Sequence, residues 1–166
     1  MKYIKNIIFS LFVISSMQCI YGTGDQMQEQ FTFDVIMRGM DAGESIITIY
    51  QTRLENKEVY KLVSTTRTKS FLDFIYKIRD KIIIHVNKED FSLLNVTKEI
   101  RQGHKKQNYS SIVDYIENKI FYKDFEIPIS TRVHDPLTII FYLRTQNLNQ
   151  DSLFSIISYN KKKVKP

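Results

Sequence analysis

The sequence predicts a mainly β (α+β) protein, a single curved antiparallel β-meander or half-barrel packed on one buried helix. Apolar and polar residues alternate with a period of two in successive runs over residues 31–129. Short turn-forming segments separate these runs, which favours strands that pair with their neighbours along the chain. A single segment near residues 136–146 lacks this alternation and is apolar on nearly every side. The length of 166 residues allows one domain.

The chain begins with the three-part pattern of a secretory signal peptide. Lys2 and Lys5 precede an apolar stretch over residues 7–14, and polar and small residues follow it. This stretch is well short of the roughly 20 residues that span a bilayer. Residues 1–22 are therefore predicted to be a removable export signal. Lipidation of Cys19, the only cysteine, is the alternative, although the two residues before it are not small.

The predicted β domain spans residues 23–160. Its first strand shows the pattern: Phe31, Phe33 and Val35 alternate with polar residues. Gly39 and Gly43 are expected to form a turn that needs positive φ. Residues 70–76 are expected to form a short helical turn or a wide connection. Further strands are expected near residues 45–49, 59–69, 76–86, 91–101, 108–116, 120–122, 125–129 and 153–159.

The longest hairpin allows a prediction of strand register. Matching of apolar residues pairs Ile84 with Leu94, and the same register sets Asp80 opposite Lys98. A shift by one residue would place polar residues opposite apolar ones on both faces, and it is therefore disfavoured.

Asp135 and Pro136 predict the start of the helix. An aspartate side chain accepts hydrogen bonds from free first-turn N–H groups, and proline suits the first helical position because it lacks an N–H. Apolar residues fill most positions from Leu137 to Leu143, so this helix is expected to be buried on several sides. Residues 161–166 form a basic tail.

The residues assemble no catalytic constellation and no metal site. The three histidines share no ligand spacing, and the chain has no phosphate-binding glycine loop and no nucleophile elbow. We therefore expect no enzymatic activity and no cofactor. The formal charge of +6 comes from Lys2, Lys5 and the four lysines of the tail, which leaves a neutral body. The excess of basic over acidic residues thus does not indicate a surface that binds nucleic acid.

Several short motifs occur in an order that resembles the domain-of-unknown-function family 3108. They are residues 39–44 (G-M-D-A-G-E), 65–68 (T-T-R-T), 79–80 (R-D), 98–103 (K-E-I-R-Q-G), 135–137 (D-P-L) and 142–145 (Y-L-R-T). The resemblance implies an exported protein of a Gram-negative bacterium, in the periplasm or associated with the outer membrane. It also implies a fold similar to the half-barrels of lipoprotein carriers. Members usually continue for several more strands, so a shortened member and a truncated gene product both stay open.

Polar residues at the positions that match the family form a candidate patch. They are expected to make a ladder across neighbouring strands, with Arg144 reaching it from the end of the helix. Two interpretations stay open: structural ion pairing, or a site for an anionic ligand or a partner. The residues are Arg67, Arg79, Asp80, Lys98, Glu99, Arg101 and Arg144.

The favoured function is a non-enzymatic binding module that holds a lipid or other apolar ligand in a cavity between sheet and helix. The alternative is a structural or interaction protein of the cell envelope, acting through an exposed sheet edge near residues 153–159. The expected partners are therefore a lipid or an envelope protein, and not a nucleic acid. Membrane contact is expected only through a lipidated Cys19 or through the basic tail.

Overall fold

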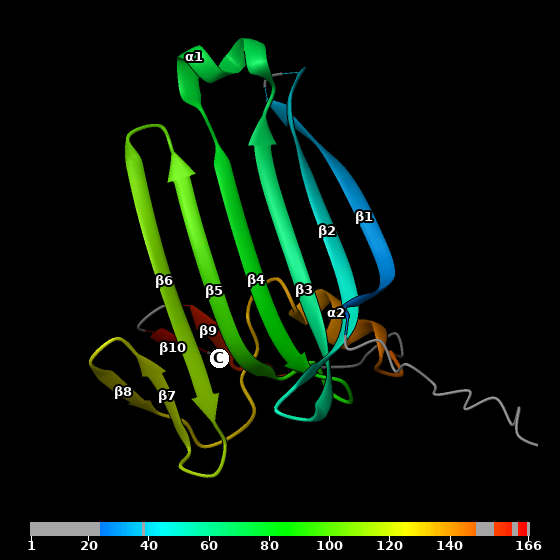
Figure 1. Ribbon diagram of the computed structural model, residues 1–166, viewed down its shortest axis with the longest axis vertical. Helices are drawn as coiled ribbons and strands as arrows, with labels where there is room; N and C mark the ends of the chain where they lie inside the picture. The colour runs from blue at the N-terminus through cyan, green and yellow to red at the C-terminus, as the bar shows by residue number, and fades with distance from the viewer. Residues whose placement is uncertain (1–23, 38, 149–154, 161–162, 166) are drawn as a thin grey trace, which may run out of the picture.

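The computed structural model describes residues 24–37, 39–148, 155–160 and 163–165. Eight strands form one antiparallel sheet in which each strand pairs with the next along the chain (Figure 1). The sheet is not closed, because β1 and β8 are its two edges. This confirms the predicted mainly β meander. The strands are β1 (Gln26–Met37), β2 (Met40–Leu54), β3 (Lys57–Thr68), β4 (Arg79–Asn87), β5 (Leu93–Gln102), β6 (Lys105–Asp114), β7 (Lys119–Tyr122) and β8 (Phe125–Pro128). The predicted signal over residues 1–22, with Cys19, lies outside the described residues.

The two glycines of the first turn have different roles. Gly39 has a φ of +79°, a conformation that side chains rarely adopt, as predicted. Gly43 is not in that region. A Cβ atom at Gly43 would lie 2.4 Å from the carbonyl oxygen of Arg67, so only glycine lets β2 approach β3 there. The expected positive φ at Gly43 is therefore wrong, and close strand packing explains the residue.

Two short helices connect β3 to β4 at one end of the sheet (Figure 1). The first is η1 (Ser70–Leu72), a 3-10 turn, and the second is α1 (Asp73–Tyr76). Their position agrees with the helical turn that the sequence predicts over residues 70–76.

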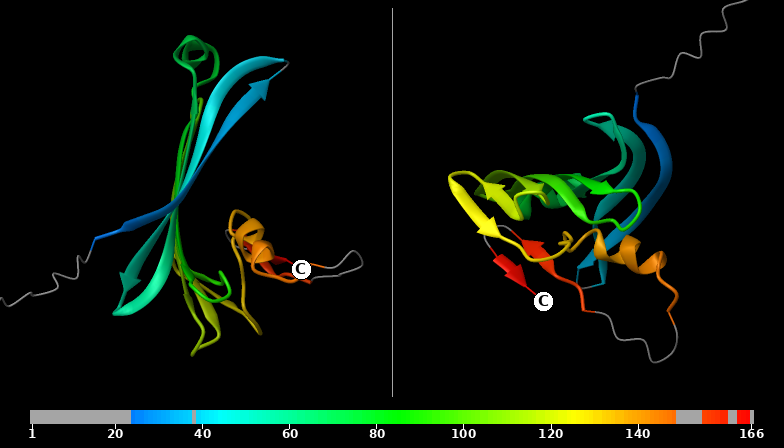
Figure 2. Two further views of the ribbon diagram at one scale, coloured as in Figure 1. Left: turned by 90° about the vertical axis from the view of Figure 1, so that its right-hand side faces the viewer. Right: turned by 90° about the horizontal axis from the view of Figure 1, so that it is seen from below.

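A second layer covers part of one face of the sheet, near the end opposite α1 (Figure 2). It contains α2 (Ile139–Arg144), β9 (Ser158–Asn160) and β10 (Lys163–Lys165). Strand β9 pairs with β10 and not with the edge of the main sheet. In its described part, the strand expected near residues 153–159 is therefore shorter and belongs to this separate two-stranded sheet rather than to the main one. The predicted basic tail contributes β10.

The helix α2 is shorter and more exposed than predicted. Residues 136–138 form a turn before the helix, in which the Asp135 carboxylate accepts a hydrogen bond from the Leu137 N–H at 3.0 Å. Asp135 therefore caps this turn rather than the helix. Phe141 is the only residue of α2 that is buried, and Ile140 is 63% exposed. Only one face of α2 packs against the rest of the protein, whereas the sequence predicts burial on several sides.

Aromatic side chains fill the space between α2 and the sheet. The ring of Phe141 lies 6.2 Å from that of Phe91 and 5.8 Å from that of Phe31. Tyr60 stacks on Phe91 at 5.4 Å. Such ring separations are typical of favourable aromatic packing. These rings continue the apolar core on the same face of the sheet, which includes Leu62.

The register of β4 and β5 differs from the prediction by two residues. Ile84 lies opposite Val96, and Lys98 lies opposite Ile82 rather than Asp80. A shift of two residues leaves every side chain on its original face, so alternation alone cannot distinguish the two registers. The connecting turn and an irregularity after His85 select the observed one.

Candidate functional site

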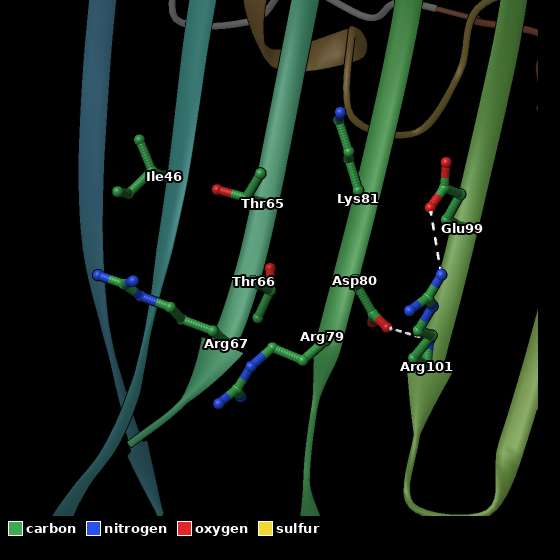
Figure 3. A pocket seen from close by; sticks show the side chains of 9 residues that line it. All are labelled: Ile46, Thr65, Thr66, Arg67, Arg79, Asp80, Lys81, Glu99 and Arg101. Atoms are coloured by element: carbon green, nitrogen blue, oxygen red, sulfur yellow. Dashed lines mark hydrogen bonds and ion pairs between the residues drawn. The ribbon is translucent and has the colours of Figure 1, made fainter. Parts of the chain in front are cut away.

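The face of the sheet opposite α2 carries a pocket of about 440 Å³ (Figure 3). Side chains alternate along a strand, so Arg67 and Lys81 point away from the core residues Leu62 and Ile84. The strands place Ile46, Thr65, Lys81 and Glu99 in one row across this face and Arg67 next to Arg79 in the adjacent row. Thr66 and Asp80 pair at the position between these rows, where side chains alternate to the other face. The lining residues are Ile46, Thr65, Thr66, Arg67, Arg79, Asp80, Lys81, Glu99 and Arg101.

The pocket brings together most of the polar patch expected from the sequence. Arg67, Arg79, Asp80, Glu99 and Arg101 all line it. The other two predicted members lie elsewhere, and each pairs with an acidic residue far away in the sequence.

Arg144 does not reach the ladder, so that expectation is wrong. Its guanidinium Nη1 lies 2.9 Å from Glu29 Oε2 in β1, and the group also lies 5.6 Å from the ring centre of Phe31. The reason is that α2 packs across the opposite face of the sheet. Arg144 therefore ties the second layer to the edge strand β1.

Arg79 holds α1 to the sheet. Its guanidinium donates hydrogen bonds to the carbonyl oxygens of Ile78 at 2.6 Å and Thr68 at 3.2 Å, and it pairs with Asp73 in α1. The Thr68 hydroxyl donates to Asp73 at 2.7 Å. This hydrogen bond, together with the contact to Arg79, lowers the pKa of Asp73. Arg79 is therefore a structural member of the pocket wall.

Asp80 links β4 to β5. Its Oδ1 accepts a hydrogen bond from the backbone N–H of Arg101 at 2.9 Å, and its Oδ2 accepts one from Gln102 Nε2 at 2.5 Å. Both carboxylate oxygens thus have protein partners. Asp80 aligns the strands beside the pocket, and its interactions fit the structural interpretation.

Arg67 and Arg101 are more exposed and more weakly held. Arg67 lies 3.0 Å from Glu44, and Arg101 lies 3.9 Å from Glu99. The two arginine side chains are 66% and 59% exposed. Such exposed ion pairs contribute roughly 0–1 kcal/mol, so an incoming anion can compete with them.

Apolar side chains adjoin the cationic end of the pocket. Ile46 is half-buried within it. The next row across the same face contains Val63 opposite Ile83, both half-buried. The pocket is therefore cationic at one end and faces a short apolar strip at the other, in which Thr48 and Thr97 flank Val63 and Ile83. The sequence reasoning missed this strip because it assigned the apolar surface to the other face.

Lys98 lies on the face that carries α2, where it forms a buried ion pair. Its Nζ lies 2.5 Å from Asp135 Oδ2, and the two side chains are only 10% and 2% exposed. Oδ2 has no hydrogen bond among the described residues. The pair connects β5 to the turn before α2. The sequence singled out both residues but did not join them, because they are far apart in the chain.

Buried polar groups surround this ion pair. The Tyr159 hydroxyl lies 2.8 Å from Ser111 Oγ, and burial raises the pKa of Tyr159. Burial likewise raises the pKa of Tyr109, whose ring lies 6.0 Å from Lys98 Nζ. These tyrosines therefore stay protonated over the ordinary pH range. The arrangement supports packing of the second layer rather than proton transfer.

Among the described residues, no group of three His, Cys, Asp or Glu side chains could hold a metal ion. Within the same part of the chain, no helix is long and apolar enough to cross a membrane.

Comparison with known proteins gives one family. No curated protein and no solved structure matches the chain. The family described as a protein of unknown function, DUF3108, matches residues 32–166. This match covers most of the chain, and it includes every strand from β2 onwards together with α2. The protein therefore belongs to the DUF3108 family.

Proposed function

We propose that the protein is a non-enzymatic binding module of the cell envelope whose ligand is an anionic lipid-like molecule. The observation that supports this proposal is the pocket opposite α2, in which exposed guanidinium groups adjoin apolar side chains. The head group would lie at Arg67 and Arg101, and the apolar chain would follow Ile46 towards Val63 and Ile83.

The charges of the pocket favour an anion. Two of its cations, Arg67 and Arg101, have only exposed acidic partners, and Lys81 is exposed in the same row as Glu99. Asp80 already has hydrogen bonds from β5 on both oxygens. Guanidinium groups bind phosphate and carboxylate through two parallel hydrogen bonds, which suits an anionic head group.

The packing of α2 explains why we place the ligand on this face. The sequence suggests a cavity between sheet and helix, but Phe141 packs there against both Phe31 and Phe91. The opposite face has the described pocket and an adjoining apolar strip. A lipid-like ligand is thus retained from the sequence-based hypothesis, and its position changes.

The test uses three amphiphiles of equal chain length below their micelle concentrations: dodecyl phosphate, dodecyl maltoside and dodecyltrimethylammonium. Isothermal titration calorimetry on the full chain is expected to show binding of the phosphate alone. The double variant Arg67→Gln/Arg101→Gln is expected to weaken it by roughly tenfold or more, because charge-assisted hydrogen bonds are lost. Inorganic phosphate is expected to bind much more weakly, since it lacks the apolar chain.

Arg132→Gln is the matched control. Arg132 is 52% exposed and pairs with Asp90 at 3.8 Å, which resembles the setting of Arg101. It lies outside the pocket lining. Equal binding of all three amphiphiles, or an equal loss in the control, would show that the arginines of the pocket do not select the ligand.

A second candidate function is strand addition at β1, favoured by a different observation. The edge strand β1 has 12 residues, and its side chains at Phe33 and Ile36 are 50% and 60% exposed. An exposed apolar edge strand can pair with a strand of another chain. Sedimentation velocity on the variant Phe33→Lys/Ile36→Lys tests this: self-association that the wild type shows and the variant loses supports it, and equal behaviour contradicts it.

A further inference from the structure

The connection between β3 and β4 forms an apolar tip at the end of the sheet away from the second layer (Figures 1 and 2). We call residues 70–76 the tip. Phe74 is 90% exposed, Ile75 68% and Phe71 58%. Clusters of exposed apolar side chains on a protein surface mark contact sites.

The fold holds the tip in place. Leu72 is buried, with 7% exposed, and anchors it from below. Asp73 joins it to Thr68 and Arg79. A Cβ atom at Gly103 would lie 3.0 Å from Tyr76 Cε2, so Tyr76 packs directly over the neighbouring β5–β6 turn. The outward position of Phe74 and Ile75 is therefore fixed by structure and not by a loose loop.

Cationic side chains outnumber anionic ones around the tip. The surrounding segments are residues 39–44, 67–80 and 101–107, which contribute strand ends and turns at this end of the sheet (Figure 1). Their cations are Arg67, Lys69, Lys77, Arg79, Arg101, Lys105 and Lys106, and their anions are Asp41, Glu44, Asp73 and Asp80, with Asp34 of β1 opposite Glu44 as a fifth anion at this level. The excess is local, because residues 23–160 as a whole are formally neutral.

We propose that the tip docks on the surface of an anionic phospholipid bilayer. Phe74 and Ile75 enter the region of the head groups. Lys77 faces the lipid phosphates, and so does Lys69, whose exposed ion pair with Asp41 a phosphate can replace. Aromatic and aliphatic side chains surrounded by cations have this distribution at membrane interfaces. This docking needs no ligand in the pocket and does not require lipidation of Cys19.

The size of the tip favours a lipid surface over a protein. A stable protein interface takes roughly 20–30 residues a side, far more than the tip offers. A bilayer needs only a few inserted side chains together with nearby cations. The charge excess fits the phosphates of an anionic lipid surface.

A single tryptophan provides a local test, because the sequence contains none. Phe74→Trp places the reporter in the tip. Ile116→Trp is the matched control, since Ile116 is also 90% exposed but lies in the turn between β6 and β7, at the other end of β6. Vesicles would contain about 30% phosphatidylglycerol in phosphatidylcholine, with pure phosphatidylcholine for comparison. The local readout excludes any signal from residues 1–22 of the full chain.

The expected result for Phe74→Trp is a blue shift of the tryptophan emission and quenching by brominated lipids in the anionic vesicles, with neither change for the control. Vesicle flotation is expected to show roughly tenfold weaker partitioning for Phe74→Ser/Ile75→Ser. Each charge removed in Lys69→Gln/Lys77→Gln is expected to cost about fivefold. The control Lys88→Gln/Lys119→Gln, in the turn after β4 and at the start of β7, is expected to cost much less. Circular dichroism checks that each variant is folded.

Three outcomes would overturn the docking proposal. Equal quenching at both positions would indicate non-specific adsorption. Vesicle binding without quenching at position 74 would indicate adhesion by charge alone. Unchanged partitioning of Phe74→Ser/Ile75→Ser would show that the apolar tip has no part in membrane contact. None of these outcomes affects the amphiphile titrations, so the docking proposal and the ligand proposal can fail separately.

Discussion

The buried pair of Lys98 and Asp135 should be among the most sensitive points of the fold. We expect the variant Asp135→Asn to lose about 3–5 kcal/mol of stability, because it leaves the Lys98 ammonium buried without a counter-charge. The structure supports a loss of stability of this size, because the charged atoms are 2.5 Å apart and the side chains are only 10% and 2% exposed. Asparagine keeps the acceptor for the Leu137 N–H, so the local turn is preserved.

A double-mutant cycle separates the pair from its surroundings. Lys98→Met keeps the length of the side chain and removes the charge. The double variant is expected to recover stability relative to Asp135→Asn alone, with a coupling energy of about 2 kcal/mol or more. Urea unfolding followed by circular dichroism measures all four chains.

The exposed pair of Lys119 and Glu126 is the control for this cycle. Its charged atoms are 2.7 Å apart, but the side chains are 39% and 56% exposed. Lys119→Met is expected to leave the urea midpoint nearly unchanged, because exposed ion pairs contribute little to stability. If Lys119→Met and Asp135→Asn lower the free energy of unfolding by the same amount, the reasoning is refuted, because burial would then have no influence on what an ion pair contributes. Additive effects of Lys98→Met and Asp135→Asn would refute it too.

Three further predictions follow from backbone fit, burial and packing. Gly43→Ala is expected to cost more than about 2 kcal/mol in urea unfolding, because its Cβ would lie 2.4 Å from the Arg67 carbonyl oxygen, whereas Gly39→Ala should cost about 1 kcal/mol from its φ of +79°. Burial lowers the pKa of His134, so its contribution to stability is full above the ordinary value of 6.5 and falls as the pH drops below it; the unfolding midpoint of His134→Gln should depend less on pH there. Phe141→Ala should cost about 3–5 kcal/mol by opening a cavity under α2, and a cost below about 1 kcal/mol would show that α2 packs loosely.

Much of the sheet could be predicted because alternation of side chains directly reports burial on one face. The turn over residues 70–76 was also visible, since the period-two pattern stops there. The register in which neighbouring strands pair was harder to predict from the sequence. The predicted pairing of Ile84 with Leu94 differs from the observed pairing with Val96 by two residues, and both place the same residues in the core. Only the geometry of the connecting turn distinguishes them.

The helix near residues 136–146 shows a different limit. Its composition correctly predicts a helix, but an apolar sequence does not state how many of its faces find a partner. Phe141 is buried, while Ile140 is 63% exposed. The sequence around Asp135 fits that of a helix cap, yet the more important interaction of its side chain is the ion pair that Oδ2 forms with Lys98. A contact between residues so far apart in the chain has no local signature in one sequence.

Two pairs of residues in the predicted ladder support different conclusions once their contacts are compared. Arg79 and Asp80 each make several hydrogen bonds to neighbouring elements, so structure alone accounts for them. Arg67 and Arg101 have only exposed partners, and they are the residues on which a ligand could act. Arg79 nevertheless connects the two proposed sites, because it lines the pocket and also pairs with Asp73 in the tip. Docking of the tip on a membrane would therefore act on one wall of the pocket. The pocket, with any lipid-like ligand in it, would lie close to the membrane from which that ligand would come.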